Sequence, residues 1–149
     1  AKLVGIDNSE SMLDTARSLH HQEADTDLIY HDLNRTPFPL EPNSVDLFTS
    51  GSVVVFLDDP FELLQELRRT LKPEGVYLLF DWQRQPLSKY VADRSTIGQE
   101  RHRIMGTQAF HNRYSIEDWH WILRESGFKV VGEARPRPNH VALVSVLGT

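Results

Sequence analysis

The chain has 149 residues, a formal net charge of −5 and no cysteine. Without cysteine it has no disulfide framework, no cysteine-ligated zinc and no catalytic thiol, which fits a cytoplasmic, reducing location. The negative charge gives no support to nucleic-acid binding, which usually uses a basic face, and no apolar run approaches the ~20 residues of a membrane span. We therefore expect an ordinary globular domain whose partners are neither nucleic acid nor membrane.

The first half of the chain predicts three strands separated by a helix and a proline-rich connection. Apolar runs predict strands at residues 2–6, 27–31 and 45–50. Asn8 or Ser9 can cap a helix after the first strand. The expected apolar face of that helix comprises Met12, Leu13, Ala16 and Leu19. The apolar residues 53–57 have no clear period, so they either prolong the third strand or lie across it.

The best-defined helix of the second half begins after Asp59. Pro60 stands at its first position, and Glu62 completes a capping box. Its expected buried stripe is formed by Phe61, Leu64, Leu67 and Leu71. Pro73 and Gly75 end it, and residues 76–80 are fully apolar, as in a strand covered on both faces.

A further helix is capped by Ser115 with Asp118 and closed by Gly127. Trp119 and Trp121 cannot share one helical face, so one of the two is expected to be exposed. Two strands, residues 129–133 and 141–147, finish the chain.

Alternation of apolar strands with helices predicts an α/β fold with a mainly parallel sheet. The last two strands are joined by about seven residues, whereas a helical crossover needs a dozen or more. We therefore expect them to pair antiparallel at one edge of the sheet.

Candidate ligand-binding residues follow the strands, because ligands of open α/β sheets bind outside the carboxyl ends. Asp7 follows the first strand, and its two carboxylate oxygens suit the vicinal hydroxyls of a ribose. Asp32 follows the second strand and suits an adenine amino group, with Leu33 covering the ring. Two further groups leave strand ends, Ser50-Gly51-Ser52 and Asp81-Trp82.

Four ordered segments resemble the class I S-adenosylmethionine-dependent methyltransferases, closest to their small-molecule, quinone-biosynthesis-like branch. They are LVGIDNSESMLDTAR, HDLNRTPFPLEPNSVDLFTS, RRTLKPEGVYLLF and YSIEDWHWILRESGFKVV. The resemblance covers nearly the whole chain. It implies a Rossmann-like sheet, S-adenosylmethionine as cofactor and a small-molecule acceptor.

The same resemblance implies a role for individual residues. Asp7 would hold the ribose hydroxyls, and Met12 would lie near the adenine or ribose edge. Asp32 would meet the adenine amino group, with Leu33 against the ring. Ser50 and Gly51 would line the floor near the methyl donor.

The family's G-x-G loop, which wraps the methionine carboxylate, would fall before Ala1. The family's first strand, which is central in the sheet, would precede Ala1 too. We therefore expect an N-terminally truncated single domain, residues 1–149, with weak or no activity by itself. Unpaired strand edges also predict association into a homodimer, although a missing segment of the native protein is the preferred explanation.

Residues 83–113 correspond to the family's substrate cover. His102, His111 and Tyr114 are the candidates for a base, without a choice among them. The arginines of this region suit either an anionic acceptor or a solvated surface; they are Arg84, Arg94, Arg101, Arg103 and Arg113. The seven histidines show no metal-ligand spacing, so no metal is expected.

Two other classes of function stay open at this stage. One is a cofactor-free, methyltransferase-like interaction or structural module, which the lack of a G-x-G loop favours. The other is a nicotinamide-dependent oxidoreductase, because an acid after the second strand also suits a dinucleotide ribose.

Overall fold

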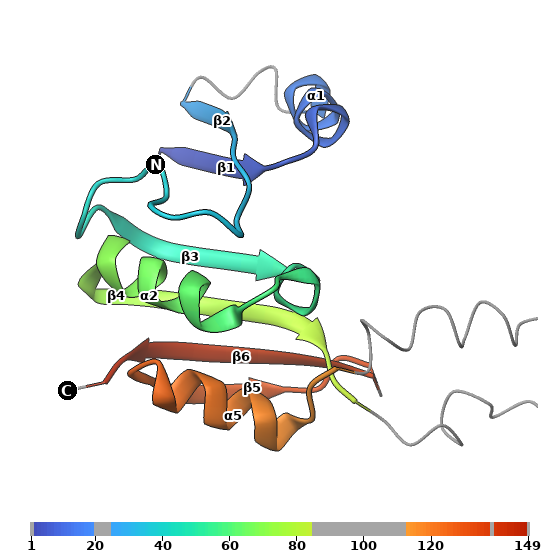
Figure 1. The fold of residues 1–149 in the computed structure, drawn as a ribbon, viewed down its shortest axis with the longest axis vertical. Helices are drawn as coiled ribbons and strands as arrows, with labels where there is room; N and C mark the ends of the chain where they lie inside the picture. Colours follow the sequence, from blue (N-terminus) through green and yellow to red (C-terminus); the bar gives the residue numbers. More distant parts are fainter. Residues whose placement is uncertain (1, 20–24, 85–112, 138, 149) are drawn as a thin grey trace, which may run out of the picture. The chain divides into compact units, whose positions relative to one another are not determined.

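The structure is a computed structural model that describes residues 2–19, 25–84, 113–137 and 139–148. It divides into two compact units, Ala1–Leu40 and Glu41–Thr149 (Figure 1). Each unit is described by itself below. The single domain expected from the sequence stays a prediction.

The first unit is a strand–helix–strand motif. Strand β1 (Leu3–Asp7) leads into helix α1 (Glu10–Leu19), and strand β2 (Thr26–Tyr30) returns beside β1. The two strands pair parallel, with Asp7 opposite Tyr30. Both predicted strands and the helix between them are confirmed.

The expected apolar face of α1 is only partly buried. Leu13 is 2% exposed, whereas Met12 is 57% and Leu19 72% exposed. The prediction is wrong for these two residues. Of the predicted face, Leu13 alone is buried.

The second unit is built on a four-stranded sheet in the order β3-β4-β6-β5 (Figure 1). Its strands are β3 (Val45–Gly51), β4 (Leu71–Trp82), β5 (Phe128–Ala134) and β6 (His140–Leu147). β3 and β4 run parallel, and β6 pairs antiparallel with both β4 and β5. The predicted α/β fold with an antiparallel C-terminal edge is confirmed, since β5 is the edge strand.

A short 3₁₀ helix resolves the alternatives for residues 53–57. This element, η1 (Val54–Phe56), begins three residues after the end of β3 at Gly51, so the segment does not prolong the strand. Val54 and Val55 are fully buried. Their burial explains why the segment is apolar without a regular period.

Two helices, α2 (Pro60–Thr70) and α5 (Ile116–Glu125), lie side by side in the second unit (Figure 1). The predicted capping box of α5 is confirmed, because Ser115 and Asp118 each accept the other's backbone N–H. Asp59 caps α2, because its Oδ1 accepts from Phe61 N at 2.8 Å. In the expected capping box the donor would be Glu62 N, one residue further along the helix. Pro60 occupies the first helical position as predicted.

The core of the second unit comes from both helices, η1 and the inner faces of β4 and β6. The side chains with the largest fully buried volume include Trp119, Tyr77, Leu63, Leu67, Leu71, Leu79, Leu123 and Leu143. The predicted stripe of α2 is confirmed at Leu64 and Leu67, whereas Phe61 is half-buried. Leu71 is buried too, but it begins β4, so the helix ends before the predicted stop at Pro73 and Gly75. Trp121 is 49% exposed, so it is the exposed member of the tryptophan pair.

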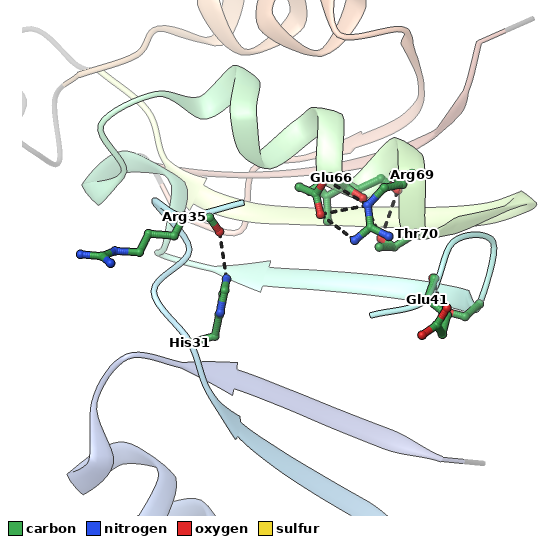
Figure 2. A network of polar contacts seen from close by, with 8 residues as sticks. His31, Arg35, Glu41, Glu66, Arg69 and Thr70 are labelled. Carbon is green, nitrogen blue, oxygen red and sulfur yellow. Dashed lines mark hydrogen bonds and ion pairs between the residues drawn. The ribbon is translucent and has the colours of Figure 1, made fainter. Parts of the chain in front are cut away.

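The C-terminus of α2 is joined to the start of β3 by backbone hydrogen bonds. Asn43 N donates to Arg69 O at 3.0 Å, and Ser44 N donates to Thr70 O at 2.8 Å. Within α2, Arg69 donates to the buried Glu66 carboxylate, its Nη2 at 2.7 Å from Oε2 (Figure 2). This pair fixes the helix end from which β4 begins.

Gly127→Ala is expected to destabilise the second unit by about 1–2 kcal/mol. Gly127 has φ +78°, and an added Cβ would lie 2.7 Å from Arg68 Nη1. The measurement is urea unfolding followed by tryptophan fluorescence. Gly132→Ala is the matched control, because its Cβ would lie 3.5 Å from Val144 Cβ, an ordinary contact. Equal stability losses in the two variants would contradict the prediction.

Among the described residues, no helix combines the length and the apolar character needed to cross a bilayer.

Candidate functional site

The two acidic residues predicted to bind a nucleoside lie at the same edge of the first unit. Asp7 ends β1, and Asp32 follows β2 by two residues. Because β1 and β2 are parallel and in register from Leu3–Thr26 to Asp7–Tyr30, their carboxyl ends meet at one rim. His31 N donates to Asp7 O at 3.0 Å, which extends the pairing towards Asp32. The predicted geometry of these two acids is therefore present.

Asp7 shapes the turn that leads into α1. Its Oδ1 accepts from Ser9 N at 2.8 Å, and the side chain is half-buried. Among the described residues, Oδ2 has no hydrogen-bond partner. One carboxylate oxygen therefore holds the turn, while the other is available to a hydroxyl group.

Asp32 orders the chain after β2. Its Oδ1 accepts from Asn34 N at 3.0 Å, and its main-chain oxygen accepts from Arg35 N at 2.9 Å. His31 Nε2 lies 2.9 Å from Arg35 O, the contact drawn in Figure 2. The result is a tight turn that presents the Asp32 carboxylate at the rim.

Arg35 also pairs with Asp32, its Nε 3.6 Å from Oδ2. The Arg35 side chain is 81% exposed, and an exposed ion pair contributes little, about 0–1 kcal/mol. An incoming amino group can therefore take the place of the guanidinium at small cost.

The apolar partners predicted for the nucleoside differ in exposure. Met12 on α1 is 57% exposed, and Leu33 beside Asp32 is half-buried. Neither is a core residue, so both have surface to offer to a ring. Met12 lies in the first turn of α1, the helix that begins just after Asp7.

Ser50 and Gly51 belong to the second unit and end β3. Ser50 Oγ lies 2.8 Å from Tyr77 Oη in the core, and burial raises the Tyr77 pKa well above its usual value. A Cβ built on Gly51 would meet nothing within 4 Å. Of the two, Gly51 is thus open to a ligand, whereas the Ser50 hydroxyl is held by Tyr77.

Asp81 is a buried carboxylate whose contacts the sequence did not reveal. It lies near the end of β4, is fully buried, and accepts from Val54 N at 2.9 Å and from Trp82 N at 2.8 Å. Burial raises its pKa to about 6, and backbone N–H groups that favour the charged form oppose this shift. Val54 is 27 residues away along the chain, so no local pattern signals the contact.

Ionisation of Asp81 is expected to lower the free energy of unfolding between pH ~4 and ~7 by roughly 2–3 kcal/mol. Its folded pKa of about 6 is above the ordinary 3.8, so the native state binds more protons than the unfolded chain in this window. The stabilisation is thus complete below the unfolded pKa and is lost as the pH rises through the folded pKa.

Urea unfolding of the wild type and Asp81→Asn across this window measures the effect. Tryptophan fluorescence reports on the second unit, which holds all three tryptophans, Trp82, Trp119 and Trp121. The difference in stability between the two proteins should change with pH. A constant difference would show that Asp81 does not titrate as expected.

The candidates for a base are only partly described. Burial raises the pKa of Tyr114, and the neighbouring Arg113 partly opposes this. At neutral pH this phenol is a hydrogen-bond donor rather than a base. His102 and His111 lie outside the described residues.

The arginines of the same region have structural contacts where they are described. Arg84 pairs with Asp118, Nη2 to Oδ2 at 3.0 Å. Arg113 donates to the backbone carbonyls of Val55, Leu57 and Asp58. Arg94, Arg101 and Arg103 lie outside the described residues, as does most of the predicted cover, residues 83–113. In the described part of the chain, no group of three or more acidic or histidine side chains is arranged to hold a metal ion.

In α/β domains, an acidic residue beyond the carboxyl end of a strand is one kind of group that can bind a ribose hydroxyl. Comparison with known families is more specific: the model of a methyltransferase domain matches residues 1–79. The chain belongs to this methyltransferase domain family.

Curated relatives match about half of the chain. Demethylmenaquinone methyltransferase of Lactococcus lactis is 34% identical over 74 residues, which is 50% of this chain and 29% of that protein. The biotin biosynthesis bifunctional protein BioHC of Cellvibrio japonicus is 37% identical over 75 residues, 50% of this chain and 14% of that protein. The chain thus spans less than a third of the length of either relative.

Solved structures share the fold of nearly the whole chain. A methyltransferase from Aquifex aeolicus described as SAM-dependent is 20% identical, with a TM-score of 0.70, over 98% of this chain and 69% of that one. The trans-methyltransferase CalH, solved with S-adenosylhomocysteine, is 16% identical, with a TM-score of 0.73, over 99% and 43%. At these identities the similarity establishes the fold.

Proposed function

We propose that the chain is the donor-binding part of an S-adenosylmethionine-dependent methyltransferase that acts on a small molecule. The observation that carries this proposal is the pair of acids, Asp7 and Asp32, at one rim of a parallel strand pair. Membership of the methyltransferase domain family supports it.

The first unit fits the adenosine part of the cofactor. The Asp7 Oδ2 oxygen, which has no partner among the described residues, accepts a ribose hydroxyl. Asp32 accepts the adenine amino group in exchange for its weak pair with Arg35. The exposed Met12 and the half-buried Leu33 provide apolar surface for the nucleoside.

In the second unit, Ser50 and Gly51 are the proposed floor near the methyl donor. Gly51 offers its backbone to the donor and leaves room beside it, because a Cβ there would meet no atom within 4 Å. Ser50 contributes backbone as well, since its hydroxyl is bonded to Tyr77.

S-adenosylmethionine supplies a methyl group already activated on a sulfonium, so transfer is an in-line displacement at carbon. The protein's share of the catalysis is therefore alignment of the reactants and exclusion of water. A base is required only if the acceptor must lose a proton. The described residues do not single one out.

A small-molecule acceptor fits the known relatives. The Lactococcus lactis relative is, by its name, a methyltransferase acting on demethylmenaquinone, and we propose an acceptor of this small-molecule class. We further propose residues 83–113 as the cover of the acceptor, in the cytoplasm. Self-association through the free edges of β1 or β3 also stays a proposal, for which sedimentation velocity is the measurement.

Isothermal titration calorimetry with S-adenosylhomocysteine tests the function most simply. The protein expressed from its complete reading frame is expected to bind this product at micromolar or lower concentration. Reduced nicotinamide dinucleotide, added in a parallel titration, is expected not to bind. A folded protein that binds neither would favour the cofactor-free module, and one that binds only the dinucleotide would favour an oxidoreductase.

A further inference from the structure

The short helix η1 is held at both ends by charged side chains from distant parts of the second unit. Asp81 meets its N-terminal end, and Arg113 meets the carbonyl groups at its C-terminal end. Ser50 and Gly51, the proposed floor of the donor site, end β3, and only Ser52 and Val53 separate them from η1.

The contact at the N-terminal end is fully buried. Asp81 Oδ2 accepts from Val54 N, the first residue of η1, at 2.9 Å, while Oδ1 accepts from Trp82 N. The carboxylate thus uses both oxygens to join the start of η1 to the end of β4. Its charge also suits the N–H groups that a helix start leaves unpaired.

The contact at the C-terminal end uses the fork of a guanidinium group. Arg113 Nη1 donates to Leu57 O at 2.5 Å and to Val55 O at 3.4 Å, and Nη2 donates to Asp58 O at 3.2 Å. The guanidinium also lies 5.0 Å from the centre of the Tyr114 ring. A lysine ammonium is a single point charge and cannot reproduce this set of contacts.

Arg113 also lies next to a backbone contact between two distant parts of the chain. Arg84 N donates to the backbone oxygen of Tyr114, the residue after Arg113, at 2.6 Å. The Arg84 side chain adds a bond to Asp118, at 3.0 Å. Arg84 and the pair Arg113-Tyr114 are therefore joined to each other by this backbone bond, and to η1 through the Arg113 side chain.

We propose that Arg113 is a positioning residue that, opposite Asp81, fixes residues 54–58 and thereby the end of β3 at Gly51, which precedes them. The fixing of residues 54–58 stands on the contacts above. The consequence for ligand binding rests on the proposed function.

Hydrogen–deuterium exchange of the full-reading-frame protein tests the first part. The amides of Phe56 and Leu57, which donate to Val53 O and Val54 O, are expected to exchange about tenfold faster in Arg113→Ala. Arg113→Lys should behave similarly, because it keeps the charge but not the fork. Amides of β6 should be unaffected. Arg124→Ala is the control, an equal change of charge at a side chain that is 69% exposed and pairs with Glu125.

The second part is tested by the affinity for S-adenosylhomocysteine, measured by calorimetry. We expect both Arg113 variants to lose at least about fivefold in affinity and Arg124→Ala to lose none. Faster exchange with unchanged affinity would show a purely structural role and overturn the positioning. Unchanged exchange would show that Arg113 does not fix residues 54–58. A wild type that does not bind would refute the proposed function and the effect on ligand binding, while exchange would still test whether Arg113 fixes residues 54–58. If Arg113→Ala does not fold, exchange and affinity are both measured on Arg113→Lys and compared with the wild type.

Discussion

Trp119→Ala is expected to lower the free energy of unfolding of the second unit by about 3–5 kcal/mol. The Trp119 side chain is 1% exposed, and its Nε1 donates to Trp82 O at 2.9 Å. Its ring lies 4.7 Å from that of Tyr114, measured between centroids. The substitution thus opens a large cavity and removes the indole donor from the part-buried Trp82 carbonyl. Urea unfolding followed by circular dichroism measures the loss.

Trp121→Ala provides the matched control on the same helix. Trp121 is 49% exposed and makes an edge contact with Phe61, 5.7 Å between ring centroids. Its removal is expected to cost about 1 kcal/mol or less. Similar losses for the two variants would mean that α5 does not pack as described. Trp119→Phe, which keeps an aromatic ring, serves if the alanine variant does not fold.

Asp7→Asn is expected to weaken S-adenosylhomocysteine binding by about 10- to 100-fold in the protein made from the complete reading frame. An amide keeps one oxygen for the bond from Ser9 N, so the turn into α1 is preserved. It lacks the charge and the second acceptor that a ribose diol requires. Isothermal titration calorimetry gives the change in Kd.

Asp27→Asn makes the same change of charge on the neighbouring strand. Asp27 lies on β2, is 57% exposed and pairs with Lys2 at 2.7 Å, away from the carboxyl ends of the strands. Its Kd is expected to stay within about twofold of the wild type. An equal loss in both variants would indicate a general electrostatic effect and would remove Asp7 from the site.

Local signals in the sequence predict most of the elements correctly. Ser115 and Asp118 form the expected capping box because each bonds a partner three residues away. The short connection between β5 and β6 requires antiparallel pairing, and the structure has it. The prediction failed at Met12 and Leu19, because helical periodicity reveals an apolar face but not whether another element covers it.

The candidate site could be predicted for residues that follow a strand, because the strand's direction decides at which edge of the sheet they lie. Asp7 and Asp32 reach the same rim because parallel strands bring their carboxyl ends together. Asp81 and Arg113 were not predictable as partners of η1, since their contacts join residues 27 and more than 50 positions apart. Likewise, nothing local to Ser50 shows that Tyr77 engages its hydroxyl.

A crystal structure of the full-reading-frame protein with S-adenosylhomocysteine is the most direct test of the central claim. We predict hydrogen bonds from the ribose hydroxyls to Asp7 and from the adenine amino group to Asp32. A nucleoside bound elsewhere, with both carboxylates left in water, would contradict the account.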